Sequence, residues 1–180
     1  GYKLSQKIHS ETEDGEKQAE LWEARRSLVP LLSTYRKDMK PVAFVEDIGV
    51  PVSNLADIIA DLEEISQRYG LVMGIYGHAG DGNLHLRPLI NLDERGSKKQ
   101  LVKLMDEVYQ TVFKYNGTIT AEHGIGRLRT TYLEKEWGSE IFGYMREVKE
   151  SFDPSGILNP GVIFSDRKVT DELKYPIHYS

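Results

Sequence analysis

The chain has 180 residues, a length that suits one domain with short appendages. Its 39% hydrophobic and 28% charged residues are ordinary for a globular domain, and no apolar run is long enough to span a membrane. A net charge of −5 with dispersed basic residues leaves no electrostatic footprint for nucleic acid, and the lack of cysteine excludes disulfides, thiolate zinc sites and iron–sulfur ligation.

The N-terminal part of the chain predicts one long helix followed by a strand. Residues 14–35 have helical spacing, with Pro30 as a kink or a stop. Arg25 falls on the apolar stripe of this helix. Its stem either lies along the helix with the guanidinium in water, or the guanidinium reaches a buried anion such as a carboxylate. Residues 41–50 are rich in β-formers between two prolines and predict a strand.

The middle of the chain alternates further helices and strands. Residues 55–69 predict a helix, and residues 71–78 and 83–90 predict two strands that the turn AGDGN joins into a hairpin. Residues 98–115 predict a strongly amphipathic helix, which ends at an Asn-Gly pair. Residues 117–122 predict a fourth strand.

The order β-α-β-β-α-β over residues 41–122 is typical of the split βαβ, ferredoxin-like pattern. In that layout, two helices cover one face of an antiparallel four-stranded sheet. Residues 126–138 and 139–152 predict two more helices, and a turn-rich closing segment follows at 153–161. We therefore expect an α+β fold with additional N-terminal and C-terminal helices.

Two histidines flank the predicted hairpin turn. Residues on either side of a tight turn face each other across about 5 Å, so the imidazoles of His78 and His85 can converge on one ion. The simpler alternative is a polar hairpin that carries two incidental histidines.

A second chemical pair, Glu122 and His123, stands at the end of the predicted fourth strand. Successive side chains on a strand point to opposite sides, which would let one of them face an ion and the other a substrate. Gly124 and Gly126 are expected to begin a helix whose first amides favour an anion. Taken alone, a helix start with a charged first turn is the simpler interpretation.

Together the two motifs favour a metal site. His78, His85 and Glu122 form a His₂Glu set with an open position, which is typical of a catalytic rather than a structural site. Nitrogen and oxygen ligands suit zinc, manganese or iron, and zinc is our first choice. The other polar residues that we considered are expected to lie on the surface: His9, His178, Arg127 and Arg129. The alternative for Arg127 is contact with an anion at the start of the helix.

At these residues the chain resembles a known family. The stretches YGHAGDGNLH, GTITAEHGIGR and FDPSGILNPG, in that order, resemble the C-terminal domain of FAD-linked oxidases, in the vanillyl-alcohol-oxidase-like superfamily. Within that family, the chain resembles glycolate oxidase flavoprotein subunits, D-lactate dehydrogenases and D-2-hydroxyglutarate dehydrogenases. LWEARR and VEDIGVPVSNL also resemble segments of that domain, so the match runs from about residue 20 to 163.

The resemblance implies the oxidation of a small D-2-hydroxy acid to a 2-oxo acid, with FAD and a divalent metal as cofactors. By this resemblance, the metal ligands are His78, His85 and Glu122, and the general base is His123. Arg25 would bind the substrate carboxylate, and Asn159 would lie near the flavin. Val45 and Val52 stand where some relatives carry a basic residue. A second carboxylate contact is therefore missing, which favours a monocarboxylate over a dicarboxylate.

The resemblance also implies a longer protein, because relatives bind FAD chiefly through a separate N-terminal domain. We expect residues 1–164 to be the substrate-side domain, inactive alone, and residues 165–180 to be a tail or a linker toward an iron–sulfur electron-transfer domain. The chain starts at Gly1 rather than at a methionine, which agrees with an excised part. We expect a cytoplasmic location, with peripheral membrane attachment through an electron-transfer partner as the alternative.

Two other functions stay open at this point. One is a non-catalytic ferredoxin-like module that binds a metal or another ligand, because a fold does not determine a function. The other is a metal-dependent hydrolase that uses the same His₂Glu set with His123 as its base.

Overall fold

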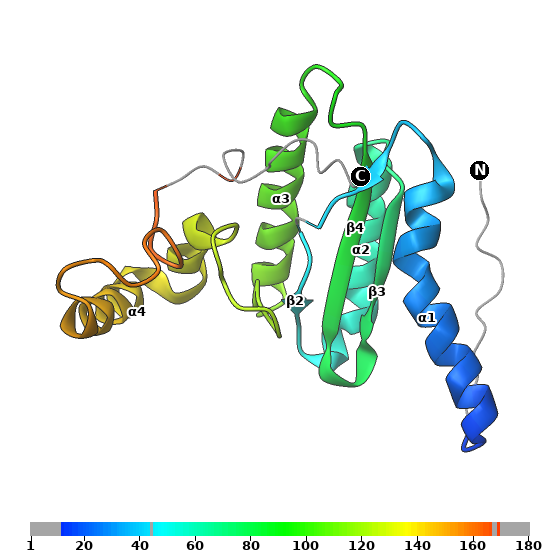
Figure 1. The fold of residues 1–180 in the computed structure, drawn as a ribbon, viewed down its shortest axis with the longest axis horizontal. Helices are drawn as coiled ribbons and strands as arrows, with labels where there is room; N and C mark the ends of the chain where they lie inside the picture. Colours follow the sequence, from blue (N-terminus) through cyan, green and yellow to red (C-terminus); the bar gives the residue numbers. More distant parts are fainter. Residues whose placement is uncertain (1–11, 44, 167–168, 170–180) are drawn as a thin grey trace.

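The structure, a computed structural model, describes residues 12–43, 45–166 and 169. The helices are α1 (Gly15–Tyr35), α2 (Leu55–Arg68), α3 (Ser97–Lys114) and α4 (Thr130–Phe152). The strands are β1 (Lys40–Pro41), β2 (Ile48–Gly49), β3 (Met73–His78) and β4 (Asn83–Ile90), with short 3₁₀ turns η1 (Val52–Asn54) and η2 (Ala79–Asp81). The α+β class is confirmed, and Figure 1 shows helices packed around a small antiparallel sheet.

Strand β4 is the centre of the sheet. It pairs antiparallel with β3 along the hairpin, with β1 near its end and with β2 near its start. On the other side of β2, the segment around Thr118 pairs with Gly49 through an isolated antiparallel bridge. The spatial order is therefore the one that a split βαβ pattern produces.

Two predicted strands are shorter than expected. The strand predicted at 41–50 is divided into β1 and β2, and Asp47 between them has a left-handed φ of 74°, which interrupts an extended run. The strand predicted at 117–122 is reduced to the bridge at Thr118. Beyond that bridge, the backbone turns and bonds to Asp47 instead of continuing the sheet.

The hydrophobic core lies between the sheet and the α2–α3 pair, which lie side by side against one face (Figure 1). Leu84 and Leu86 of β4 point into this core and are at most 4% exposed. The helices contribute Ile58, Leu62, Ile65, Leu101, Leu104, Met105, Val108 and Val112, all buried and all at the predicted apolar spacing. Because side chains alternate along a strand, the residues between these leucines face the other side of the sheet.

Helix α1 covers part of that other face. It runs through Pro30 without stopping, so a helix stop at this proline was wrong. Leu32 packs against Gly74 of β3 so closely that a Cβ added to Gly74 would lie 2.6 Å from a leucine methyl carbon. A glycine at this position therefore lets α1 approach the hairpin.

Helix α4 extends away from the sheet (Figure 1). Gly138 has a non-helical φ of 78° and divides α4 into two helices, close to the predicted division at 138/139. The first of them begins at Thr130, so the prediction that Gly124 and Gly126 begin a helix was wrong. Both glycines have left-handed φ values, 76° and 58°, and lie in a loop.

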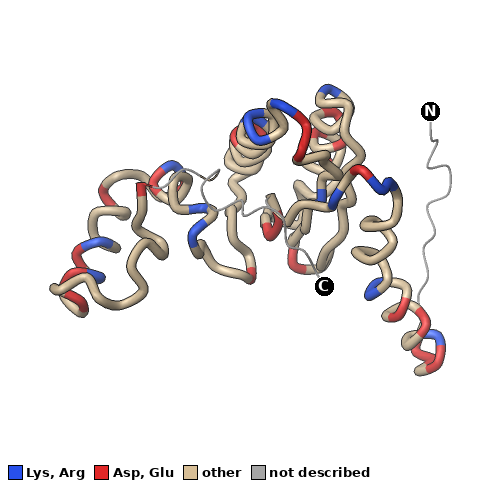
Figure 2. The backbone as a smooth tube through the Cα atoms, turned by 45° about the horizontal axis from the view of Figure 1, so that its top comes forward, with Lys and Arg blue, Asp and Glu red and all other residues tan. Residues whose placement is uncertain are grey.

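Charged residues occur on each of the helices α1 to α4. Figure 2 shows basic and acidic residues interspersed along the backbone, without a long basic stretch in the part that the structure describes. Among the described helices, none combines the length and the apolar character that a membrane crossing requires. His9 and His178 lie outside the described residues.

Candidate metal centre

The hairpin carries both predicted metal-binding histidines on the face opposite the core. Tyr76 pairs with His85 and His78 pairs with Asn83 across the two strands. The rings of His78 and His85 meet edge to face with their centroids 5.9 Å apart. The two histidines are therefore diagonal neighbours rather than directly opposite each other as the sequence had predicted, and their imidazoles still meet.

Glu122 and His123 reach the same place from the loop after Thr118. Glu122 Oε1 lies 3.3 Å from His78 Nε2, and the His123 ring stacks on the His85 ring at 5.3 Å and 11°. One donor atom each from His78, His85 and Glu122 lies within 4.8 Å of the others. That spacing allows one ion to contact all three side chains after small rotations.

The buried nitrogen of His85 fits a cation. His85 is 5% exposed, and its Nδ1 atom has no hydrogen-bond partner among the described residues. Burial lowers the pKa of His85, which favours the neutral imidazole that binds metals. Because an unpaired buried polar atom is unfavourable, a metal ion at this nitrogen would remove the penalty. The residues present therefore fit the divalent metal that the family resemblance implies.

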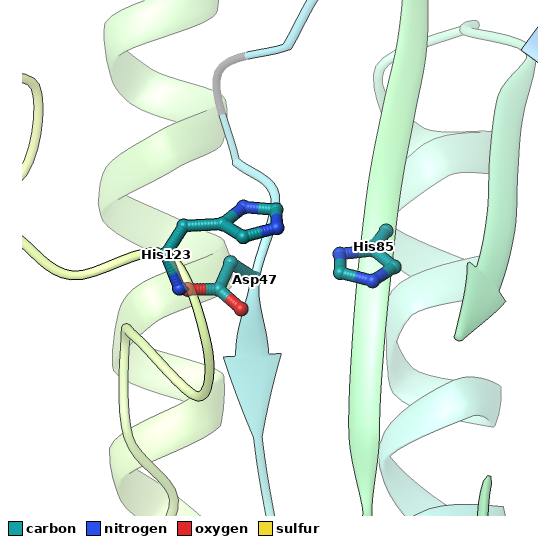
Figure 3. A group of neighbouring side chains, drawn as sticks. All are labelled: Asp47, His85 and His123. Carbon is teal, nitrogen blue, oxygen red and sulfur yellow. Dashed lines mark hydrogen bonds between the residues drawn. The ribbon is translucent and has the colours of Figure 1, made fainter. Parts of the chain in front are cut away.

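Asp47, His85 and His123 form a second group with the same spacing, shown in Figure 3. The carboxylate of Asp47 already accepts hydrogen bonds on both oxygens. A carboxylate bonded in this way has little acceptor capacity left for an ion. The set of His78, His85 and Glu122 is therefore the better candidate.

Asp47 was not among the predicted site residues. It is fully buried, and it accepts bonds from the backbone N–H groups of Glu122 and His123 at 2.9 and 2.8 Å. The available signal was an acidic residue directly before the apolar strand residue Ile48, in a segment that otherwise reads as buried. The contact joins positions that are 75 and 76 residues apart, which no local pattern predicts.

Arg129 was also misassigned, because it is buried rather than on a helix surface. Its guanidinium donates to the carbonyl groups of Gly124 and Glu46 and lies 4.0 Å from the carboxylate of Asp47. Arg129 therefore links the loop that carries Glu122 and His123 to the backbone at Glu46. Arg127 is exposed, as expected.

His123 stands beside the candidate metal ligands without being enclosed. Its Nδ1 atom lies 4.0 Å from a carboxylate oxygen of Glu46, and its Nε2 atom lies 3.8 Å from Glu122 Oε2. Its side chain is 46% exposed. A ring that is accessible and close to acidic groups can exchange a proton with a bound molecule.

Arg25 comes to the edge of this site through Tyr76. The guanidinium of Arg25 stacks over the Tyr76 ring at 4.2 Å from its centroid, and the Tyr76 ring lies 5.4 Å from that of His85. The Tyr76 hydroxyl accepts a bond of 3.1 Å from Arg87, which is also paired with Glu46. Arg25 is therefore partly buried on the side of α1 that faces the hairpin.

Asn159 lies in the exposed closing segment, with a left-handed φ of 47°. That segment is attached to the loop after His123, because Ile163 donates a backbone bond of 2.8 Å to Gly126. A cavity of about 750 Å³ opens elsewhere, beside Thr118 and Trp137, and the candidate metal ligands do not line it.

Comparison with known proteins agrees with the motifs. The family model described as FAD linked oxidases, C-terminal domain, matches residues 3–163. A D-2-hydroxyglutarate dehydrogenase of Haemophilus influenzae is 37% identical over 153 residues, covering 85% of this chain and 15% of that protein. The glycolate oxidase subunit GlcD of Bacillus subtilis is 34% identical over 145 residues, covering 81% of this chain and 30% of that protein.

A mitochondrial D-lactate dehydrogenase (cytochrome) of Kluyveromyces lactis is 37% identical over 154 residues, covering 84% of this chain and 26% of that protein. The chain thus spans less than a third of the length of each of these relatives. The resemblance to FAD-linked oxidases that the sequence motifs indicated is confirmed.

Proposed function

The chain belongs to the C-terminal domain family of FAD-linked oxidases, and we propose that it is the substrate-side domain of a flavin-dependent dehydrogenase that oxidises a small D-2-hydroxy acid to a 2-oxo acid. The observation that carries this proposal is the meeting of His78, His85 and Glu122 with the accessible ring of His123 beside them. The relatives described above are named as dehydrogenases or as an oxidase, which supports this function over a non-catalytic module or a hydrolase.

His78, His85 and Glu122 would hold the divalent cation. Zinc is our first choice, followed by manganese or iron, because the donors are two imidazoles and a carboxylate. When bound there, the cation supplies Lewis-acid polarisation of the substrate hydroxyl and lowers its pKa. The unpaired Nδ1 atom of buried His85 is the observation that supports a cation here.

His123 accepts the proton of the substrate hydroxyl. Its exposed ring is open to a bound acid, and backbone bonding to Asp47 fixes its position. FAD, held mainly by a part of the protein outside this chain, supplies the two-electron acceptor for the α-hydrogen. Loss of the hydroxyl proton and of the α-hydrogen as hydride leaves the 2-oxo acid.

Arg25 binds the substrate carboxylate. The Tyr76 ring supports its guanidinium from one side, which limits its rotamers and leaves its N–H groups available for a bidentate contact. Val45 is fully buried in the core, and Val52 is an exposed apolar residue. Neither offers a second cationic contact, so we propose a monocarboxylate of the lactate or glycolate type as the substrate.

We further propose that residues 1–164 form one domain and that the second half of α4 and the closing segment face the FAD-binding part of the same protein. Exposed apolar side chains in this region support such a contact; examples are Phe152, which is 83% exposed, and Ile157, which is 74% exposed. Asn159 would then lie near the flavin. Residues 165–180, of which the structure describes only 165, 166 and 169, are proposed as a tail or a linker toward an iron–sulfur partner.

We place the whole enzyme in the cytoplasm, either free or bound peripherally to a membrane through an electron-transfer partner. The electron-transfer partner follows from the proposed function, because an electron acceptor must reoxidise the flavin.

The test compares two variants of the full-length enzyme. His123→Gln should lower the rate of flavin reduction by D-lactate or glycolate on the order of 10²–10⁴-fold, the usual contribution of a general base, while metal content stays unchanged. Arg25→Met should mainly raise KM for the acid, because it removes a binding contact. Arg26→Met is the matched control, since Arg26 pairs with Glu23 on the exposed side of α1. Flavin reduction at the wild-type rate in His123→Gln would contradict the proposal.

A further inference from the structure

We propose that Asp47 is a positioning residue of the metal centre, which fixes the turn that carries Glu122 and His123 and does not itself bind the ion. Its consequence for catalysis rests on the proposed function, whereas the structural role stands on the contacts alone. Asp47 has no counterpart among the residues that the sequence motifs assigned to the site.

The carboxylate of Asp47 accepts hydrogen bonds from two segments that are distant in the sequence, the loop at 120–123 and the start of β4. Its Oδ1 atom accepts from Glu122 N at 2.9 Å and from the side-chain amide of Asn83 at 3.3 Å. Its Oδ2 atom accepts from His123 N at 2.8 Å and from the Thr120 hydroxyl at 3.0 Å. The same carboxylate thus joins the loop at 120–123 to the first residue of β4.

The backbone of Asp47 contributes to the same arrangement. Its carbonyl oxygen accepts from Ala121 N at 3.0 Å. Its φ of 74° is a left-handed conformation, which aspartate tolerates better than most residues but which is still unfavourable for a residue with a Cβ. This turn interrupts the strand predicted at 41–50 and directs the carboxylate toward the loop. Strain of this kind is typical of a position that the surrounding contacts impose.

Arg129 supplies a positive charge next to the buried carboxylate of Asp47, which offsets the cost of its burial. Its Nη1 atom lies 4.0 Å from Oδ2 of Asp47, and the side chains of the two residues are 7% and 0% exposed. A buried carboxylate without such a partner would be strongly destabilising. The pair therefore forms a fixed support under the loop, and the predicted ligand and the predicted base extend from that loop.

Ligation by Asp47 itself is the rival explanation, because Asp47, His85 and His123 also lie close enough to share an ion. Figure 3 shows Asp47 and His123 on one side of the site and His85 opposite them on β4. The carboxylate already accepts four hydrogen bonds, two of them from the backbone amides of Glu122 and His123, so binding an ion would require it to give up at least one of these bonds. Those amides are at the residues that the site needs in place, so we favour positioning over ligation.

The test uses Asp47→Asn in the full-length protein, because asparagine keeps the shape and one acceptor oxygen but loses the charge and the second acceptor. Three quantities are measured: hydrogen exchange of the Glu122 and His123 amides, titration with Co²⁺ followed by its visible absorption, and the rate of flavin reduction. Asp106→Asn is the matched control, since Asp106 accepts a hydroxyl bond of 2.6 Å from Tyr132 away from the site.

In Asp47→Asn we expect faster exchange at both amides and Co²⁺ affinity about 10- to 100-fold weaker, the usual effect of losing a residue that orients ligands. At saturating Co²⁺ the shape of the absorption band should match that of the wild type, because the ligands are the same. Flavin reduction should fall about 10²-fold, as expected for a displacement of about 1 Å. The Asp106→Asn control should match the wild type in Co²⁺ affinity and in the exchange of the Glu122 and His123 amides.

A changed band shape at saturating Co²⁺ would overturn the proposal in favour of ligation by Asp47. Wild-type amide exchange together with wild-type Co²⁺ affinity would overturn it as well. If the wild-type enzyme itself neither binds Co²⁺ nor reduces its flavin, the proposed function fails, while amide exchange still decides whether Asp47 holds the loop. If Asp47→Asn does not fold, Thr120→Val removes one donor from the same carboxylate. It should shift exchange in the same direction by less, and no shift would contradict the proposal.

Discussion

Replacing Gly82 by alanine tests whether the tight hairpin turn holds the two predicted metal-binding histidines together. Gly82 follows η2 with a left-handed φ of 67°, and its carbonyl oxygen accepts a bond of 3.0 Å from Val50 N. A Cβ added there would stand 1.9 Å from the carbonyl oxygen of Val50, and a backbone atom cannot rotate out of the way as a side chain can. The alanine must therefore push residues 50–51 away from the hairpin.

The expected magnitude follows from two contributions. The left-handed conformation costs an alanine roughly 1–2 kcal/mol. Loss of the Val50–Gly82 backbone bond adds about 0.5–1.5 kcal/mol. Together these lower the free energy of unfolding by about 1.5–3.5 kcal/mol, and affinity for a divalent metal should weaken as the separation of His78 and His85 changes.

The assay is urea unfolding of the metal-free protein, followed by metal titration of the same samples. Gly80→Ala is the matched control in the same turn, because a Cβ at Gly80 meets no atom within 4 Å. Its stability should stay within about 0.5 kcal/mol of the wild type. Equal stability and equal metal affinity in the two variants would refute the reasoning.

Two further predictions concern buried ionisable side chains. Arg129→Met should destabilise the protein by roughly 3 kcal/mol, because it leaves the carboxylate of Asp47 buried without its cation, whereas Arg127→Met, at an exposed position, should have little effect in the same urea assay. Burial lowers the pKa of His85 from its ordinary value of 6.5, so the unfolded chain binds that proton more readily than the folded, metal-free chain. The free energy of unfolding should therefore fall as pH drops through the range near 6.5 and level off below the folded pKa, and His85→Asn should remove this part of a pH series; an unchanged profile would contradict it.

Much of the fold could be predicted because local apolar spacing and turn residues indicate its helices and its hairpin. The apolar spacing of residues 98–115 and the AGDGN turn each point to one structure, and both predictions agree with α3 and with the β3–β4 hairpin. The divided strand at 41–50 could not be predicted, because Asp47 leaves the extended conformation to bond with residues far along the chain. The start of α4 was missed for a similar reason, since the buried contacts of Arg129 hold the preceding residues in a loop.

The candidate site shows the same division between local and distant information. The types and spacing of His78, His85, Glu122 and His123 suggested a shared site, and the structure brings these side chains together. Their support could not be predicted. Asp47 acts through a contact between remote segments, and its one local signal, an acidic residue within an apolar segment, does not say which residues it contacts.

The most direct measurement of the central claim is a crystal structure of the metal-loaded full-length enzyme, with anomalous diffraction recorded at the absorption edge of the bound metal. We expect a single ion about 2.0–2.2 Å from an imidazole nitrogen of His78, one of His85 and a carboxylate oxygen of Glu122, with Asp47 outside its coordination sphere. An ion held by Asp47 and His123 instead, or no ion at the hairpin in an enzyme that still oxidises its acid, would contradict the account.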